Sequence, residues 1–327
     1  MIITKAPFRI SFFGGGSDIE DYYLNHSGAV LSATINKYVY ISSHHFFSKD
    51  QIRLKYSQTE TVFQTKDIKH NIFRQVLEEF NVNGAIELSS NADIPSGTGM
   101  GSSSAFTVAL LLNKYTRNNH QVDKYQLASK ACEIEINKLK APIGKQDQFA
   151  STFGGLNRIC FPKSGKITVT PIQIQPEIKK KLKENLILIC VGNRRDANDY
   201  LRIQKQNYKK EHIIAIQKEM VDLVTQSEQA LLNQDLTTFA KNIDYTWQLK
   251  QKLSEKITNK SINELYDHAK KNGAIGGKLL GAGGAGFMLF YCEKENQKKL
   301  KHALKNTSEL VFDFEDKGAD VVHVSDE

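Results

Sequence analysis

Residues 93–105 read Asp93-Ile-Pro-Ser-Gly-Thr-Gly-Met-Gly-Ser-Ser-Ser-Ala105, and they decide which fold and chemistry the sequence predicts. We expect a β-strand just before them, at 85–90, and a buried helix just after them, from about 102 to 116. The alternating glycines can adopt positive φ angles and let the backbone approach a ligand closely. The serines fall where the helix begins, and its unpaired N–H groups and positive dipole end favour an anion. The stretch therefore predicts a phosphate-binding loop.

The spacing of this loop excludes two common nucleotide-binding motifs. No Lys-Ser or Lys-Thr follows the last glycine, as a P-loop requires, and the pattern G-x-G-x-G differs from the dinucleotide pattern G-x-G-x-x-G. A tight turn capped by serine is the structural alternative. Three glycines and three serines at 97–104 are more than a cap requires, which favours the ligand site.

With 327 residues the chain is long for one domain, so we predict two domains that share a cleft. The composition changes near 171–176, which divides the chain into predicted domains at 1–172 and 173–327. The net charge of +8 indicates an anionic ligand or a polyanion. The lysine-rich runs at 179–183 and 298–301 lack interleaved aromatic residues, so we expect solvated helix faces and no nucleic-acid partner.

The cysteines and the N-terminus indicate the cellular compartment. The four cysteines are far apart, at 132, 160, 190 and 292, in apolar surroundings, and are predicted to be free buried thiols. The N-terminus lacks a signal-peptide pattern, and no apolar run approaches the roughly 18 residues of a membrane span. We therefore expect a cytoplasmic protein with no membrane partner, and the sequence leaves open whether it forms a homodimer.

Two more glycine-rich stretches and one polar cluster stand out. Gly14-Gly-Gly-Ser-Asp18 interrupts a strand predicted at 2–13, so Asp18 could accept hydrogen bonds from a polar ligand or simply cap a flexible hairpin. The stretch Gly273–Gly286 contains seven glycines and enters a predicted strand, which indicates close backbone packing or a second ligand-facing loop. Gly144-Lys-Gln-Asp-Gln-Phe-Ala150 follows a helix predicted at 124–138, and taken alone its aspartate could be a surface residue.

Together these stretches hold the groups that phosphoryl transfer needs, namely a phosphate cradle, a metal-binding carboxylate and a base. Mg²⁺ takes oxygen ligands, for which a serine hydroxyl and one glutamate are suitable. Glu133 and Glu135 are two residues apart on a predicted helix, so only one of them can face such a site. The other charged candidates are Arg9, Asp18, Lys145, Asp147, Arg194 and Arg195.

Three of these stretches, in this order, resemble the motifs of the GHMP kinase superfamily, which includes galactokinase and mevalonate kinase. Ala6-Pro-Phe-Arg-Ile-Ser-Phe-Phe-Gly-Gly-Gly-Ser-Asp18 resembles the first motif, Pro95–Ala105 the central ATP-binding motif, and Gly276–Phe287 the third. The resemblance covers the chain from end to end. It implies an α+β fold of two domains, an ATP-binding N-terminal domain like domain 2 of ribosomal protein S5 and a ferredoxin-like C-terminal domain.

The resemblance also implies a role for each matching residue. Asp147 would be the catalytic aspartate with Arg9 beside it, either removing a proton or mainly orienting the acceptor hydroxyl. Glu135 would bind Mg²⁺ together with Ser103, with Ser102 and Ser104 as alternatives to that serine. The implied ATP-binding residues are Pro95, Gly97, Gly99, Met100, Gly101, Ser102, Ser103 and Ser104. The implied substrate-binding residues are Gly15, Gly16, Asp18, Lys145, Arg194, Arg195, Gly283 and Gly284.

Within the superfamily, the first motif and the Gly-Lys-Gln-Asp-Gln cluster most resemble the D-glycero-D-manno-heptose 7-phosphate kinases, with L-fucokinase domains next. This implies Mg-ATP-dependent phosphorylation of the anomeric hydroxyl of heptose 7-phosphate, giving the 1,7-bisphosphate used towards GDP-heptose and surface polysaccharide. Two alternatives are a kinase for a neutral sugar such as L-fucose or galactose, and a GHMP-fold protein that binds without catalysis. Ala285 interrupts the glycine run of the third motif and would be strained if its φ angle had to be positive.

Overall fold

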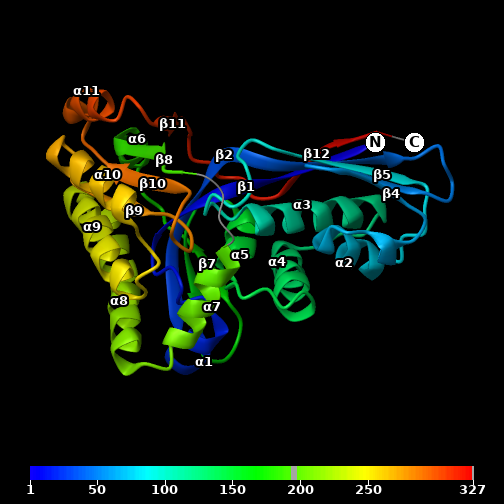
Figure 1. Ribbon diagram of the computed structural model, residues 1–327, viewed down its shortest axis with the longest axis horizontal. Helices are drawn as coiled ribbons and strands as arrows, with labels where there is room; N and C mark the ends of the chain where they lie inside the picture. Colours follow the sequence, from blue (N-terminus) through cyan, green and yellow to red (C-terminus); the bar gives the residue numbers. More distant parts are fainter. Residues whose placement is uncertain (193–196, 326–327) are drawn as a thin grey trace.

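The computed structural model describes residues 1–192 and 197–325 and contains two β-sheets, one of eight strands and one of four (Figure 1). The strands of the larger sheet are β1 (Ile2–Phe13), β2 (Gly28–His45), β3 (Ile52–Lys55), β4 (Thr59–Val62), β5 (Ile86–Ala92), β6 (Leu156–Phe161), β7 (Thr168–Pro171) and β12 (Asp320–Val324). Their order is β12-β1-β2-β5-β3-β4, and β6 pairs with both β2 and β7. The long strand β2 joins the two parts of this sheet because its first half pairs with β6 and its second half with β5.

Helices cover one face of the larger sheet, as Figure 1 shows for α2, α3 and α4. The helical elements of this half are α1 (Glu20–His26), a 3₁₀ turn (Thr65–Asp67), α2 (Asn71–Glu79), α3 (Ser102–Arg117), α4 (Lys124–Cys132), a π-helix (Glu133–Lys138) and α5 (Gln146–Phe153). The predicted buried helix is confirmed as α3, which is buried at every position from Ser104 to Leu111. It is buried on several sides because it packs against β1 and β2 as well as α4 and α5.

The smaller sheet and a second set of helices form the other half of the molecule. Its strands are β8 (Leu186–Cys190), β9 (Gly276–Leu279), β10 (Phe287–Tyr291) and β11 (Ser308–Leu310), in the antiparallel order β11-β8-β10-β9. Its helices are α6 (Pro176–Asn185), α7 (Ala197–Asn207), α8 (Glu211–Leu232), α9 (Leu236–Lys252), α10 (Lys260–Lys271) and α11 (Lys294–Ala303). Numbered along the chain, the strand order is 4-1-3-2, which confirms the ferredoxin-like prediction.

The last strand differs from the prediction. The predicted second domain, 173–327, includes this strand, but β12 pairs antiparallel with β1 at the edge of the larger sheet. The chain therefore returns to its own beginning, and the N–H of Ser325 donates to the carbonyl of Met1. Short terminal strands carry little information about which sheet they join, because either edge satisfies their backbone groups. The boundary at 172/173 stays a prediction.

The two halves share one hydrophobic core. Phe12 and Phe13 at the end of β1 contact Phe239 of α9 edge-on, with ring centroids 5.4 and 5.1 Å apart. All three rings are fully buried. Of the four cysteines, which carry free thiols, Cys132 and Cys292 are buried, whereas Cys160 and Cys190 are half-buried. None of the helices in the described ranges is long and apolar enough to cross a membrane.

Candidate active site

The glycine loop before α3 has the backbone that its sequence predicts. Gly97, Gly99 and Gly101 have φ angles of 80°, 76° and 79°, and Gly101 is the N-cap of α3. The loop lines an open cavity of about 1350 Å³ that lies between the two halves. Seven of the eight predicted ATP-binding residues line it, namely Pro95, Gly97, Gly99, Gly101, Ser102, Ser103 and Ser104. The eighth, Met100, is fully buried in the core, and its carbonyl accepts a hydrogen bond from the backbone N–H of Arg9.

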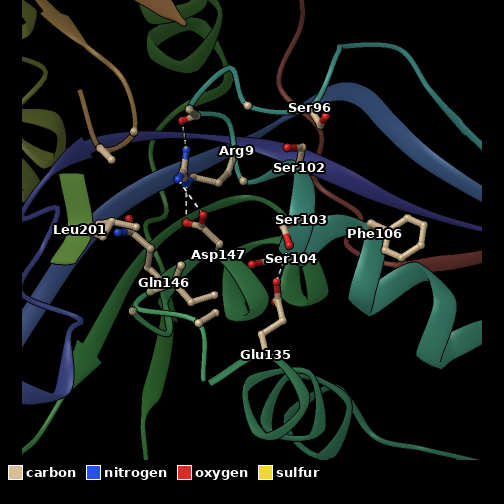
Figure 2. A pocket seen from close by; sticks show the side chains of 18 of the residues that line it. Arg9, Ser96, Ser102, Ser103, Ser104, Phe106, Glu135, Gln146, Asp147 and Leu201 are labelled. Atoms are coloured by element: carbon tan, nitrogen blue, oxygen red, sulfur yellow. Dashed lines mark hydrogen bonds and ion pairs between the residues drawn. The ribbon is translucent and has the colours of Figure 1, made fainter. Parts of the chain in front are cut away.

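Arg9 and Asp147 form a bidentate ion pair at this cavity (Figure 2). Arg9 Nε donates to Asp147 Oδ1 at 2.7 Å, and Nη2 donates to Oδ2 at 2.8 Å. The remaining Nη1 donates to the carbonyl of Gly99 at 2.7 Å, which ties the pair to the glycine loop. Two parallel charge-assisted bonds fix both side chains in one geometry. The structure therefore brings together three residues that are far apart in the sequence.

Gly101 allows Asp147 to approach the loop. Asp147 lies in the first turn of α5, and a Cβ atom at position 101 would be only 3.2 Å from Asp147 Oδ2. The side chain of Asp147 is 22% exposed, so it remains accessible from the cavity. Two features thus favour glycine at position 101, its positive φ angle and its close contact with the carboxylate.

Ser103 and Glu135 meet at the start of α3, as Figure 2 shows. Ser103 Oγ donates to Glu135 Oε1 at 2.6 Å, and Gln148 Nε2 donates to Oε2 at 2.7 Å. Glu135 is 2% exposed, and this burial raises its pKa despite the hydrogen bonds that favour the anion. Its neighbour Glu133 instead forms surface ion pairs with Lys130 and Lys138. The prediction that only one glutamate faces the site therefore holds for these two side chains.

A π-helix turns Glu135 towards the cavity. The sequence predicted a continuous helix at 124–138, but α4 ends at Cys132 and Glu133–Lys138 forms a π-helix. Such wider turns occur often at functional sites because they rotate side chains out of the α-helical register. No signal in the sequence predicted this change.

The Ser103–Glu135 pair fits a magnesium ion bound together with phosphate. Within the described ranges no three side chains of His, Cys, Asp or Glu come together as a metal cage. Mg²⁺ is commonly held by one or two protein oxygens plus phosphate oxygens and water, so a full cage is not required. The buried carboxylate of Glu135 has no cationic partner among the described residues, which also suits a cation.

Asp18 lies near the Arg9–Asp147 pair and is held by backbone and side-chain donors. It is 2% exposed and accepts from Gln146 N at 3.0 Å, Gln146 Nε2 at 2.9 Å and Gly16 N at 3.2 Å. Burial raises the pKa of Asp18 to about 6, and the charge of Asp147 adds to this rise. Sequence reasoning did not assign Gln146, whose side-chain oxygen accepts from Ser11 Oγ at 2.8 Å. Gln146, which directly precedes Asp147 in the chain, therefore orients the carboxylate of Asp18.

Five of the other predicted substrate-binding residues divide into three groups. Gly15 and Gly16 line the cavity as expected. Lys145 does not line it, because its ammonium is 3.0 Å from a carboxylate oxygen of Glu20 and donates to the hydroxyl of Tyr23. The predicted Arg194 and Arg195 lie outside the described residues.

The third glycine-rich stretch meets the cavity at a different point from the one predicted. Gly281 and Ala282 line the cavity, whereas Gly283 packs against Ile257 and Gly284 against the ring of Tyr200. Gly281, Gly283, Gly284 and Gly286 all have positive φ angles. Ala285 is not among the described residues with a positive φ angle, so the condition for backbone strain at this position is not met.

Sequence reasoning missed two lysines and one apolar wall of the cavity. Lys250 and Lys278 come from α9 and β9 and line the cavity. His70 and Phe106, whose ring centroids are 5.1 Å apart, line it together with Leu139. Lys278 lies within the third motif, which did not single it out, and the other four residues belong to none of the motifs. Each of the five comes from a different part of the chain, and no sequence signal would have assembled them.

Comparisons with known proteins agree with this arrangement. Residues 68–155 match the model of the GHMP kinases N terminal domain, and residues 227–309 match that of the GHMP kinases C terminal domain. The chain therefore belongs to the GHMP kinase family, whose members use ATP as the phosphate donor. The resemblance and the fold class that the sequence predicted are confirmed.

Individual relatives give a finer comparison. The D-glycero-alpha-D-manno-heptose 7-phosphate kinase of Campylobacter jejuni is 28% identical, over 96% of each chain. A galactokinase of Thermotoga neapolitana is 23% identical over 95% of each chain. A crystal structure of a D-glycero-D-manno-heptose 1-phosphate kinase from Bacteroides thetaiotaomicron covers 100% of both chains with a TM-score of 0.81 and 23% identity. The last similarity is one of fold alone.

Proposed function

We propose that the protein transfers the γ-phosphoryl group of Mg-ATP to the anomeric hydroxyl of D-glycero-D-manno-heptose 7-phosphate, giving the 1,7-bisphosphate. The observation that carries a kinase reaction is the Arg9–Asp147 pair, which hydrogen-bonds to the glycine loop in the same cavity as Asp18. The similarity to the Campylobacter jejuni enzyme over nearly the whole chain supports the heptose 7-phosphate. The similarity to a galactokinase makes a neutral sugar the alternative substrate that the assay has to exclude.

The chain's own groups account for nucleotide binding. The N–H groups of the loop 97–104 and the positive end of α3 would hold the ATP phosphates. His70, Phe106 and Leu139, which all belong to the first half, line the cavity and offer a wall for the base. Ser103 and Glu135 would hold the Mg²⁺ that accompanies ATP and that reduces repulsion between phosphate charges.

Asp147 and Arg9 act on the acceptor. Both carboxylate oxygens of Asp147 accept from the guanidinium of Arg9, which stabilises the carboxylate anion. A lone pair on each oxygen remains for the acceptor hydroxyl, so Asp147 can orient this hydroxyl and take its proton late in the reaction. Arg9 then stabilises the negative charge that develops on the attacking oxygen. Asp18, which Gln146 fixes, would accept from a neighbouring sugar hydroxyl.

An assay of ADP release tests this proposal. Mg-ATP is combined with heptose 7-phosphate, free heptose, L-fucose or galactose, using the wild type and Asp147→Asn. We expect turnover selective for heptose 7-phosphate and a loss of about 10²–10⁴-fold in kcat for the variant, since it removes a group that acts directly on the acceptor.

Other outcomes change the proposal in defined ways. Faster turnover of free fucose or galactose would keep the kinase and overturn the substrate. Binding of a polyanion that falls steeply with salt and persists in Asp147→Ala, without ADP release from any sugar, would favour a binding protein.

A further inference from the structure

Lys250 lines the cavity from the second half of the molecule. It lies in the last turn of α9, and its ammonium donates to the carbonyls of Leu279 at 2.8 Å and Gly281 at 2.5 Å. These two carbonyls lie at the end of β9 and in the turn after it. That turn touches the glycine loop directly, because a Cβ atom at Gly99 would be 2.7 Å from the carbonyl of Leu280. Lys250 therefore lies close to the place where Arg9 donates to the carbonyl of Gly99.

No described carboxylate neutralises the charge of Lys250. Throughout residues 1–192 and 197–325 no carboxylate forms an ion pair with it, and its recorded acceptors are two neutral carbonyls. Burial and the nearby positive charge of Arg9 lower the pKa of Lys250 to about 7. A buried charge without an ionic partner is costly, so an anion from the cavity would complete this site.

Among the residues that the structure describes, one N–H of Lys250 has no acceptor and can reach such an anion. An ammonium has three N–H groups, and the two carbonyls occupy two of them. Lys278 likewise donates to two carbonyls, those of Ser11 and Phe12, where it links β9 to β1, but it is only 3% exposed. Of these two lysines, the side chain of Lys250 is the more accessible from the cavity.

We propose that Lys250 is a catalytic residue that donates its third N–H to a non-bridging oxygen of the phosphoryl group during transfer. In this step the bond between the γ-phosphorus and the β–γ bridging oxygen breaks, a bond from the γ-phosphorus to the acceptor oxygen forms, and ADP keeps the bridging oxygen. The acceptor proton passes to Asp147, and Lys250 neither gains nor loses a proton. This inference rests on the proposed phosphoryl transfer but not on the identity of the sugar.

The test compares Lys250→Met and Lys250→Arg with the wild type, and Lys270→Met serves as the matched control. Lys270 also donates to a backbone carbonyl, that of Ile275, but it pairs with Asp244 and does not line the cavity. We expect Lys250→Met to lower kcat about 10²-fold, as for loss of one donor to a developing charge, with Lys250→Arg recovering part of it. The KM for ATP, the affinity for ADP and the thermal midpoint should stay near the wild-type values, and Lys270→Met should keep its kcat.

A second measurement uses ADP with Mg²⁺ and aluminium fluoride, which mimics the phosphoryl group in transit. Adding aluminium fluoride should increase the affinity for ADP of the wild type and of Lys270→Met, but not that of Lys250→Met. A kcat of Lys250→Met within threefold of wild type would overturn the role. A parallel loss of kcat, ADP affinity and thermal midpoint would also overturn it, because that pattern defines a structural anchor of the Gly281 turn. If the wild type transfers to no sugar, the substrate proposal fails, and the same comparison on hydrolysis of ATP still tests Lys250.

Discussion

At the scale of single residues, Asp18 is a buried carboxylate that the fold holds with three N–H donors. Those bonds favour the anion, yet burial outweighs them, and the pKa of Asp18 is raised from 3.8 to about 6. A ligand that donates further hydrogen bonds to this carboxylate would stabilise its anionic form. This arrangement suits a sugar hydroxyl, and it makes Asp18 a measurable source of pH dependence.

The stability of the ligand-free protein should depend on the charge of Asp18. Because its pKa in the fold, about 6, exceeds its ordinary value of 3.8, the protonated form stabilises the fold below about pH 4, and this contribution is lost as the pH rises through about 6. The amide of Asp18→Asn does not titrate, so the variant does not lose stability at this position as the pH rises. The free energy of unfolding of the variant, relative to the wild type, should therefore increase by about 2 kcal/mol between pH 4 and pH 7. Urea unfolding at several pH values measures it, and a difference that is constant with pH would contradict this account.

At the scale of structural elements, the glycine loop and the turn after β9 approach each other so closely that side chains cannot fit between them. Gly99 has a φ angle of 76°, and its missing Cβ atom leaves room for the carbonyl of Leu280. Gly281 has a matching restriction, since a Cβ atom there would be 2.4 Å from the Cα atom of Gly99. Each half thus contributes one glycine-rich segment to a single contact beside the Arg9–Asp147 pair.

Gly99→Ala should therefore impair catalysis more than its backbone strain alone explains. Gly165→Ala is the matched control, because Gly165 also has a positive φ angle, 95°, but has open space around it. Both variants should lose about 1–2 kcal/mol of unfolding free energy from the φ angle. Gly99→Ala should lose more than this and should lower kcat at least about tenfold, because it displaces the loop that positions the phosphates. Urea unfolding and kcat provide the comparison, and equal effects of the two variants would show that the close contact has no function.

The same elements show where local sequence signals end. The start of α3 follows from the glycines and serines around it, because these residues satisfy a local backbone requirement. The π-helix that turns Glu135 inward has no such signal, and it forms where Glu135 can bond Ser103 and Gln148 on two other helices. A helix that gains two buried hydrogen bonds can change its register at modest cost.

At the scale of the whole molecule, the core continues from one half into the other. Phe12 and Phe13 from β1 contact Phe239 from α9, and Lys278 of β9 donates to the carbonyls of residues 11 and 12. These contacts lie next to the cavity, so the interface between the halves also supports the site. We expect the two halves to unfold together.

Trp247, the only tryptophan, reports on this cooperativity because it is buried in α9. Its fluorescence and the far-ultraviolet circular dichroism of the whole chain should change at the same urea concentration. Phe239→Ala should shift both transitions together, with a loss of about 3–5 kcal/mol. Phe63→Ala, at a ring that is 61% exposed, should have little effect. Two separated transitions in the wild type would show that the halves are independent.

The sequence by itself determined the family, the two sheets with their helices and the residues of the glycine loop, together with Arg9, Asp18, Glu135 and Asp147 as candidates. The glycine loop follows from spacing and glycine content that act locally, whereas the fold and the roles of these four residues follow from the resemblance of the motifs to the GHMP kinases. Only the tertiary structure decided that β12 joins the first sheet, that Lys145 pairs with Glu20, and that Lys250 and Gln146 lie at the cavity. Those outcomes depend on contacts between distant elements, where burial and charge pairing select one partner among many, and no local pattern encodes that choice.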